Sequence, residues 1–374
     1  MKSPAYKIAF FGSSLVSAYW NGAATYYRGI IKALHQLGHQ ITFFEPDAFQ
    51  RQQHRDIPDP GWAEVVVYQP TEQGAKDALA RSRNHDIVVK ASGVGVNDSL
   101  LEKEVLNNRQ PDQKVIFWDV DAPATLESMR SNPGDKLKKL IPDYDLVFTY
   151  GGGRPVIDAY EAFGAKRCVP VNNALDPDTH HPTEKKDRYV CDLAFLGNRL
   201  PDREERMNRY FFSVADSLPD KTFILGGSGW ESREMSDNIR YLGHIYTNEH
   251  NAFNVSPKAV LNINRDSMAE MGFSPATRVF EAAGAGACII TDAWEGLELF
   301  LEPGEEVLVA HSGEDVIQLM QELTREKAAA IGKAALNRVL ASHTYRNRAK
   351  KVVEALQGSA VTDTVTDAVT SEQE

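Results

Sequence analysis

Two charged side chains stand in a stretch that is otherwise small and apolar. Residues 274–296 read SPATRVFEAAGAGACIITDAWEG, and Arg278 and Glu281 are the charges in its middle. Ser274 followed by a proline is typical of a helix start, because serine can cap free amides and proline is tolerated in the first turn. We therefore expect a helix that begins one or two residues after Ser274, with Arg278 and Glu281 on one face near its N-terminus.

The exposed N-terminus of such a helix suits a diphosphate. It offers free amides and a partial positive charge, beside which Arg278 is placed. Glu281, one turn deeper, can accept hydrogen bonds from a pair of ribose hydroxyls. The alternative is a helical salt bridge between Arg278 and Glu281, worth only about 0.2–0.5 kcal/mol. The apolar surroundings favour the ligand interpretation, because charges are seldom placed beside such a run without a partner or a task.

Further polar residues follow apolar runs that have the composition of strands. Asp119 and Asp121 come at the end of FWDVDAP, where carboxylates are costly unless they are used. One of them is a candidate general base or ligand of an acceptor hydroxyl, and the alternative is that one caps the helix after Pro123. Asn264 and Arg265 lie at another strand end, in NINRDS, where a ligand role is favoured.

Loops that contain glycine follow two more of these runs. Gly12, Ser13 and Ser14 come after the first run, where backbone amides would lie near a diphosphate if two domains close. This loop does not match the G-x-G-x-x-G dinucleotide fingerprint. Gly229 lies in GGSGW, and its loop either faces a base or phosphate or makes an ordinary turn.

Two alternating series of strands and helices must position these residues. Short β-rich runs are separated by stretches with helical spacing, a pattern that indicates parallel strands with crossover helices. In the first half the expected strands are 6–12, 39–46, 85–93, 114–120, 145–152 and 166–171. In the second half they are 191–197, 222–229, 239–245, 259–265, 287–292 and 306–310. The expected fold class is α/β, with two Rossmann-like, doubly wound domains facing a central cleft.

Composition changes along the chain predict the domain boundaries. The polar segment 176–188 carries two prolines and no periodic apolar face, which is typical of an interdomain linker. We expect one domain at 1–175 and another at 189–342, with a last amphipathic helix at 343–357. Residues 358–374 are polar and of low complexity, and we expect them to be disordered.

The overall composition is that of a soluble globular protein. The chain has 374 residues, of which 42% are hydrophobic and 25% charged, enough for two domains. Its formal charge of −11 gives no overall drive toward nucleic acid or anionic lipid. The three cysteines lie singly in apolar runs, as buried thiols of a reducing compartment do. With no signal peptide or membrane span in the sequence, we expect a cytoplasmic protein.

The region 256–310 resembles the donor-binding domain of GT-B glycosyltransferases, in particular the CgeB-like spore-maturation and group 1 branch. Its motifs are AVLNINR, SPATRVFEAAGAGACIITD and WEGLELFLEPGEEVLVA, with LAFLGNRLPDR and GGSGW upstream. VPVNNALDPDTHHP resembles the interdomain signature of the same superfamily. The C-terminal half matches in its motifs, whereas the N-terminal half matches only in layout, as the acceptor domains of this class usually vary.

The resemblance assigns roles to residues of the second half. It implies that Glu281 binds the ribose hydroxyls of a nucleotide-sugar donor. It also implies that Gly197, Asn198 and Arg199 face the donor phosphates. Arg199 is then the first choice for stabilising the charge of the leaving diphosphate.

The remaining donor contacts come from the same resemblance. LGHIYTNE resembles the lining of the nucleobase pocket, with backbone groups of His244 and Ile245 as contacts. The helix start with Ser274 and Thr277 completes the expected donor-binding set. Retaining members carry a further glutamate eight residues before the ribose-binding one, and this chain has Phe273 there.

We expect no catalytic metal, because GT-B enzymes usually work without one. The D-x-D of Asp119 and Asp121 resembles the metal motif of the other major glycosyltransferase fold. The adjacent His180 and His181 are not expected to bind a metal, because no third ligand lies nearby in sequence. The expected co-substrate is a nucleoside diphosphate sugar, with no other cofactor.

The expected function is sugar transfer to an unidentified hydroxylated acceptor: a small molecule, glycan, lipid or protein. The resemblance also implies that the last helix crosses back to the N-terminal domain. We expect a monomer or homodimer with no nucleic-acid partner and no transmembrane segment. The alternatives are a nucleotide-sugar epimerase or hydrolase on the same fold, or a non-catalytic nucleotide-sugar-binding protein.

Overall fold

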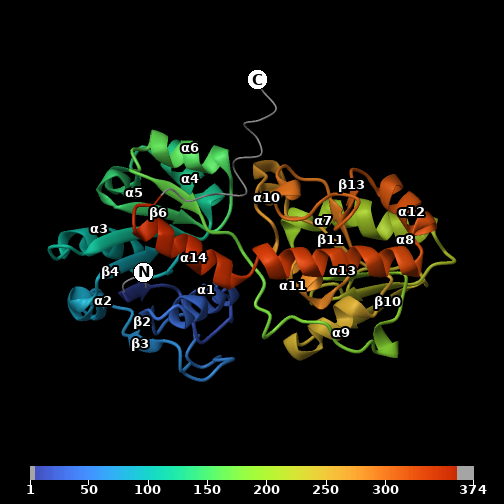
Figure 1. The fold of residues 1–374 in the computed structure, drawn as a ribbon, viewed down its shortest axis with the longest axis horizontal. Helices are drawn as coiled ribbons and strands as arrows, with labels where there is room; N and C mark the ends of the chain where they lie inside the picture. Colours follow the sequence, from blue (N-terminus) through green and yellow to red (C-terminus); the bar gives the residue numbers. More distant parts are fainter. Residues whose placement is uncertain (1–4, 360–374) are drawn as a thin grey trace. The chain divides into compact units, whose positions relative to one another are not determined.

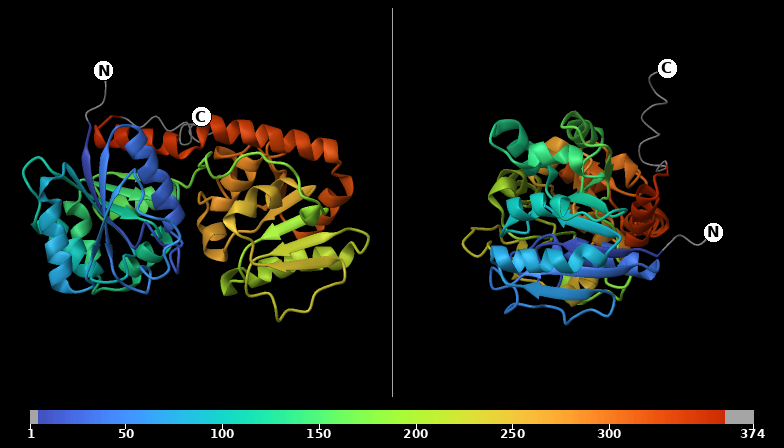
Figure 2. Two further views of the ribbon diagram at one scale, coloured as in Figure 1. Left: turned by 90° about the horizontal axis from the view of Figure 1, so that it is seen from below. Right: turned by 90° about the vertical axis from the view of Figure 1, so that its left-hand side faces the viewer.

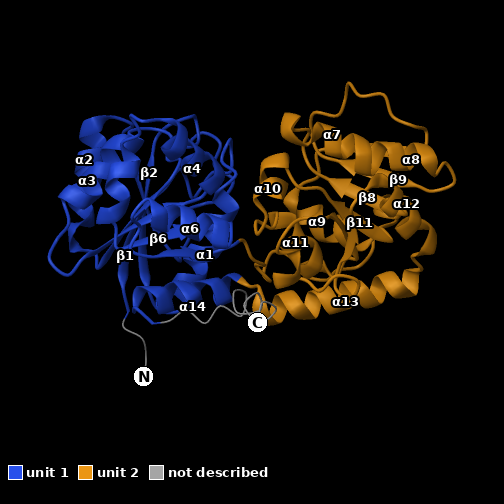
Figure 3. Ribbon diagram, turned by 90° about the horizontal axis from the view of Figure 1, so that it is seen from above, with its two compact units in different colours: residues 1–172, 345–361 blue, residues 173–344, 362–374 orange. Residues whose placement is uncertain are grey.

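The computed structural model describes residues 5–359, which divide into two compact units (Figure 3). Unit 1 comprises residues 5–172 and 345–359, and unit 2 comprises residues 173–344. The tail that we expected to be disordered lies outside the described residues, apart from its first two. Each unit has its own sheet and its own core.

The segment 176–188, which we expected to link the domains, lies within unit 2. Hydrogen bonds hold it there: the N–H of Lys186 donates to the Ser256 hydroxyl at 2.9 Å, and the side-chain amide of Asn251 donates to the carbonyl of Thr179 at 3.0 Å. A polar segment with prolines can therefore pack on unit 2, because its backbone groups make the hydrogen bonds.

Unit 1 is built on a seven-stranded, fully parallel sheet in the order β3-β2-β1-β4-β5-β6-β7. Helices lie on both faces of this sheet (Figures 1 and 2), which explains why its central strands are apolar on both sides. The strands are β1 (Lys7–Phe11), β2 (Gln40–Pro46), β3 (Glu64–Tyr68), β4 (Ile87–Ala91), β5 (Lys114–Asp119), β6 (Leu146–Thr149) and β7 (Cys168–Pro170). The helices are α1 (Ala24–Gln36), α2 (Glu72–Arg81), α3 (Asp98–Asn107), α4 (Ala122–Ser131), α5 (Leu137–Leu140), α6 (Arg154–Ala162) and α14 (Tyr345–Leu356).

The core of unit 1 is rich in aromatic side chains. Phe10 stacks on Phe43 with ring centroids 5.4 Å apart, and it also packs against Trp118. Trp118 donates from Nε1 to the Tyr26 hydroxyl at 3.0 Å, and that hydroxyl donates to the carbonyl of Val171 at 2.6 Å. The polar tips of these two large buried side chains are therefore satisfied.

Unit 2 contains a six-stranded parallel sheet in the order β10-β9-β8-β11-β12-β13. Separate apolar cores lie on its two faces. The strands are β8 (Leu193–Leu196), β9 (Phe223–Gly226), β10 (Ile239–Gly243), β11 (Ala259–Asn262), β12 (Ile289–Asp292) and β13 (Leu308–Ala310). The helices are α7 (Glu204–Met207), α8 (Ser213–Ser217), α9 (His250–Val255), α10 (Asp266–Met271), α11 (Thr277–Ala285), α12 (Gly313–Glu322) and α13 (Arg325–Ser342).

Each sheet reverses its winding at one place. The reversal falls between β1 and β4 in unit 1, and between β8 and β11 in unit 2. Because all strands are parallel, their carboxyl ends share one edge, and ligands of such folds bind outside the point of reversal. In unit 2 the loops after β8 and β11 lie at this point.

Helix α14 follows α13 in the chain but packs on α1 in unit 1 (Figure 1). Gly29 permits the contact: a Cβ added there would lie 2.2 Å from the ring of Tyr345. Real side-chain carbons do not approach so closely, so the two helices depend on the missing side chain.

We predict that Gly29→Ala lowers the free energy of unfolding by about 1–3 kcal/mol, because the buried Tyr345 ring must move. Urea unfolding measures the change. Gly61→Ala is the matched control, since Gly61 is exposed and an added Cβ would meet no atom within 4 Å. Equal stability of the two variants would show that α14 does not depend on this contact.

Candidate functional site

Helix α11 begins at Thr277 with Ala276 as its N-cap residue, and no side chain caps it. The cap predicted from Ser274 is therefore wrong, because Ser274 lies two residues before the N-cap. Gly272 and Phe273 just ahead have φ values of 67° and 51°. Ala276 has extended backbone angles (φ −62°, ψ 145°), so an extended connection leads into α11.

Arg278 and Glu281 do not form the salt bridge that their spacing allows. Within residues 5–359, the structure records neither a hydrogen bond nor an ion pair for Arg278. Its guanidinium lies over the ring of Phe195, 5.7 Å from the centroid. Burial lowers the pKa of Arg278, and the Glu281 carboxylate partly offsets this effect. A half-buried guanidinium with uncommitted N–H groups is prepared to bind an anion.

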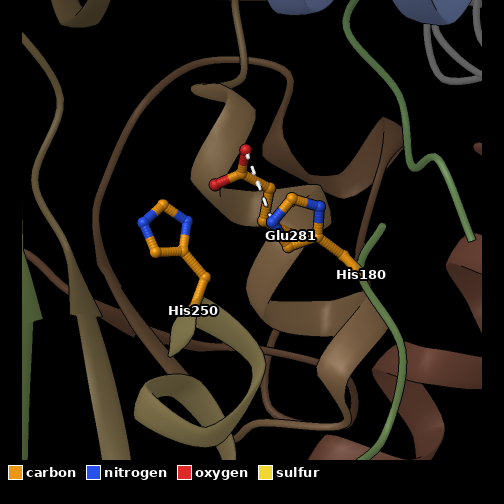
Figure 4. A group of neighbouring side chains, drawn as sticks. All are labelled: His180, His250 and Glu281. Atoms are coloured by element: carbon orange, nitrogen blue, oxygen red, sulfur yellow. Dashed lines mark ion pairs between the residues drawn. The ribbon is translucent and has the colours of Figure 1, made fainter. Parts of the chain in front are cut away.

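Glu281 faces two histidines (Figure 4). His180 comes from the segment that docks on unit 2, and His250 is the first residue of α9. The three side chains each offer one ligand atom, and these atoms lie within 4.8 Å of one another. Burial lowers the pKa of His250, and the nearby Glu281 carboxylate opposes the shift. Sequence reasoning missed His250, because 70 residues separate it from His180 and no spacing links them.

Small residues allow the chain that carries His180 to approach α11. A Cβ added at Gly284 would lie 2.3 Å from Leu175 and 3.1 Å from the carbonyl of His180. The run of alanine and glycine after Glu281 therefore lets a backbone segment pass close to the helix.

The loops after β8 and β9 are joined to each other. Asn198 accepts a hydrogen bond through its side chain from the β9 loop at 3.0 Å, and the N–H of Gly197 donates to β9 at 2.9 Å. A Cβ added at Gly229 would lie 3.1 Å from the side chain of Arg199. Arg199 itself makes two 2.8 Å hydrogen bonds to Glu204. The arginine that was our first choice for the diphosphate is therefore already paired, whereas Arg278 is not.

The residues after β11 also form hydrogen bonds or ion pairs with other residues of unit 2. The N–H of Asn264 donates to the buried Asp292 carboxylate at 3.1 Å, while its side-chain nitrogen is buried without a partner among the residues that the structure describes. Arg265 donates to Asp202 at 2.5 Å. Asn264 thus lies in the interior and Arg265 in a surface ion pair.

Of the two residues expected at the nucleobase, one is exposed and the other is buried. His244 is exposed and lies edge-on to Tyr246, with ring centroids 4.7 Å apart. Ile245 is buried, and its carbonyl accepts a hydrogen bond from Nε2 of His250 at 3.2 Å. This carbonyl orients His250 in the structure.

The loop after β1 is buried in unit 1. The hydroxyl of Ser13 donates to Asn21 at 2.8 Å, and that of Ser14 donates to Glu45 at 3.0 Å. Gly12 packs on an aromatic ring of β2. The backbone amides of Ser13 and Ser14 make no hydrogen bond to any residue that the structure describes.

The two aspartates after β5 differ in their surroundings. Asp119 is fully buried and accepts hydrogen bonds from Ser92 at 2.7 Å, from Thr125 at 2.9 Å, from the N–H of Asp121 at 3.0 Å and from Tyr160. Burial raises the pKa of Asp119, and these hydrogen bonds reduce the rise. Asp121 is exposed and occupies the N-cap of α4, but its side chain makes no cap hydrogen bond.

We predict that Asp119→Ala lowers the free energy of unfolding by at least about 3 kcal/mol, because four donors lose their acceptor. Asp121→Ala should leave it within about 0.5 kcal/mol of the parent. Urea unfolding of both variants measures the difference. The hydrogen-bond network has no such role if the two variants unfold alike.

Comparisons with known proteins concern the family and the fold of the chain. A family described as glycosyl transferase-like has a sequence model that matches residues 203–354. No curated protein matches the sequence significantly. None of the helices between residues 5 and 359 is long and apolar enough to cross a membrane.

Solved structures resemble nearly the whole chain. Sucrose-phosphate synthase from Thermosynechococcus elongatus has a TM-score of 0.66 at 12% identity, covering 94% of this chain and 98% of that one. HepE from Anabaena in complex with UDP-glucose has a TM-score of 0.63 at 14% identity, and the match covers 94% of this chain and 100% of that one. An alpha-glucosyltransferase in complex with UDP-glucose and DNA containing an abasic site has a TM-score of 0.68 at 14% identity. This match covers 95% of this chain and 100% of that one. The chain therefore has the GT-B fold, and the predicted fold class of two Rossmann-like, doubly wound domains is confirmed.

Proposed function

We propose that this protein is a glycosyltransferase that uses a nucleoside diphosphate sugar. Arg278 is the main support, because its half-buried guanidinium has no hydrogen-bond partner among the described residues and lies in the first turn of α11. Glu281 follows on the same helix face. A diphosphate and a ribose diol complement this pair. The family match and the fold agree with the proposal.

In this proposal the two side chains have separate tasks. Arg278 and the amides at the start of α11 stabilise the negative charge that develops on the diphosphate as the bond to the sugar breaks. Glu281 accepts hydrogen bonds from the ribose and anchors the nucleotide. Arg199 can contact the diphosphate only when its hydrogen bonds to Glu204 break. HepE binds UDP-glucose, so UDP is the first nucleotide to test.

The acceptor is proposed to be a hydroxylated molecule other than nucleic acid. The alpha-glucosyltransferase above was solved with DNA, but this chain has a formal charge of −11. Asp121 is the better candidate for the general base, because both oxygens of Asp119 already accept hydrogen bonds. We propose that the protein acts in the cytoplasm without a catalytic metal or a further cofactor.

Phe273 favours a second candidate function, the binding of a nucleotide sugar without transfer. It occupies the position at which retaining enzymes carry a sugar-contacting glutamate. Its φ of 51° is strained for a bulky residue, and a Cβ added at Gly296 would lie 2.3 Å from its ring. Product analysis with UDP-sugars, with and without acceptors, separates transfer, hydrolysis and binding alone.

We predict that Glu281→Gln weakens UDP binding about 10- to 100-fold, because the ribose loses a charged acceptor. Calorimetric titration measures the affinity. Glu322→Gln is the matched control, since Glu322 is exposed at the end of α12 and should leave binding unchanged. Full UDP affinity in Glu281→Gln would contradict the proposed ribose contact.

We also predict that Arg278→Gln weakens UDP binding at least about 10-fold more than Arg199→Gln does. The uncommitted guanidinium contacts the diphosphate, whereas Arg199 is paired with Glu204. The same titration compares the two variants, with uridine as a ligand that lacks phosphates. An equal loss for uridine and UDP in Arg278→Gln would rule out a phosphate contact.

Chelation tests the absence of a catalytic metal. Sugar transfer should survive excess EDTA, because arginine and helix amides supply the positive charge at the diphosphate. Measured turnover before and after dialysis against EDTA gives the result. Loss of activity that manganese restores would establish a metal-dependent reaction instead.

A further inference from the structure

His180, His250 and Glu281 form a group with unusual hydrogen bonding. His180 is only 5% exposed, and its Nε2 has no hydrogen-bond partner among residues 5–359. Nδ1 of His250 is likewise buried without a partner in the described part of the chain. Buried polar atoms are nearly always satisfied, so two orphaned imidazole nitrogens in one place require an explanation.

The other nitrogen of each ring is held in place. Nε2 of His250 contacts the carbonyl of Ile245 at 3.2 Å. A carbonyl can only accept, so Nε2 carries the proton and Nδ1 has a free lone pair. Nδ1 of His180 contacts the Thr179 hydroxyl at 3.0 Å and leaves Nε2 toward Glu281. Metal-binding histidines are oriented in the same way, by a hydrogen bond from the nitrogen that does not bind.

We propose that His180 Nε2, His250 Nδ1 and a Glu281 oxygen form a zinc-binding site. Figure 4 shows the three side chains turned toward one another from the docked segment, α9 and α11. Nε2 of His180 lies 3.9 Å from Oε1 of Glu281, and all ligand atoms lie within 4.8 Å. Two ligands of one tetrahedral zinc lie about 3.3 Å apart, so side-chain rotations that shorten these separations by up to about 1.5 Å complete the site.

The ligand types select zinc over the common hard cations. Two imidazoles and one carboxylate are a familiar zinc set that leaves a fourth position open, whereas Mg²⁺ and Ca²⁺ prefer oxygen ligands. Arg278 lies one turn away on α11 and repels a cation, which limits the affinity.

The zinc site shares Glu281 with the ribose contact of the proposed function. One carboxylate cannot bind a zinc ion and a ribose diol together at full strength, so zinc and UDP should compete. This competition rests on the proposed function, whereas zinc binding by the three side chains does not.

Calorimetric titration of metal-free protein with Zn²⁺ alone tests the site. We expect one zinc ion per chain, no comparable signal with Mg²⁺, and an affinity at least about 10-fold lower in His180→Ala and in His250→Ala. His181→Ala is the matched control, because this neighbouring histidine is exposed and outside the group. Circular dichroism verifies that the variants fold, and the absorption spectrum of bound Co²⁺ identifies a tetrahedral site in the parent. Parental zinc affinity in both folded histidine variants, or no binding by the parent, overturns the site.

A second titration separates the site from the proposed function. UDP affinity should fall as Zn²⁺ is added, and Glu281→Gln should weaken both ligands. Zinc binding without any UDP binding leaves the metal site in place and removes the proposed function. Undiminished UDP binding at saturating Zn²⁺ shows that Glu281 is not shared.

Discussion

Every strand in each unit runs parallel to its neighbours, and the position of the polar loops depends on this constraint. Parallel strands need crossover helices, so each strand ends at the same edge and is followed there by a loop and a helix N-terminus. In unit 2 this edge gathers residues that are far apart in the sequence, among them Asn198, Asn264 and Arg278. The same constraint operates in unit 1, where it places Ser13 and Asp121 at one edge.

The charged residues at the edge of unit 2 differ in whether the protein itself supplies them with a partner. Arg199 is paired with Glu204 and Arg265 with Asp202, so both guanidinium groups already have carboxylate partners. Arg278 has no such pair within residues 5–359, and its guanidinium lies over the ring of Phe195, partly out of water. An arginine without a protein partner retains its full capacity for an anionic ligand, which is why it carries the donor-binding proposal.

Close approach of the backbone is the second requirement of the site. Gly284 on α11 admits the chain that bears His180, and Gly296 admits the ring of Phe273. Larger residues at either position would separate the segments. Side chains from two other segments therefore reach the carboxylate of Glu281, and this convergence is the basis of both the proposed ribose contact and the proposed metal site.

The sequence alone determined the doubly wound fold, the approximate strands other than β3, and the helix that bears Arg278 and Glu281, because local periodicity and glycine placement encode these features. It also indicated both charges as ligand-binding candidates. Only the tertiary structure showed that Arg199 is paired, that Asp119 is buried in a hydrogen-bond network, and that the cap from Ser274 is not made. It alone brought His250 to His180 and Glu281. Contacts between residues 70 or more positions apart depend on how strands and helices pack, and no local pattern in the chain records them.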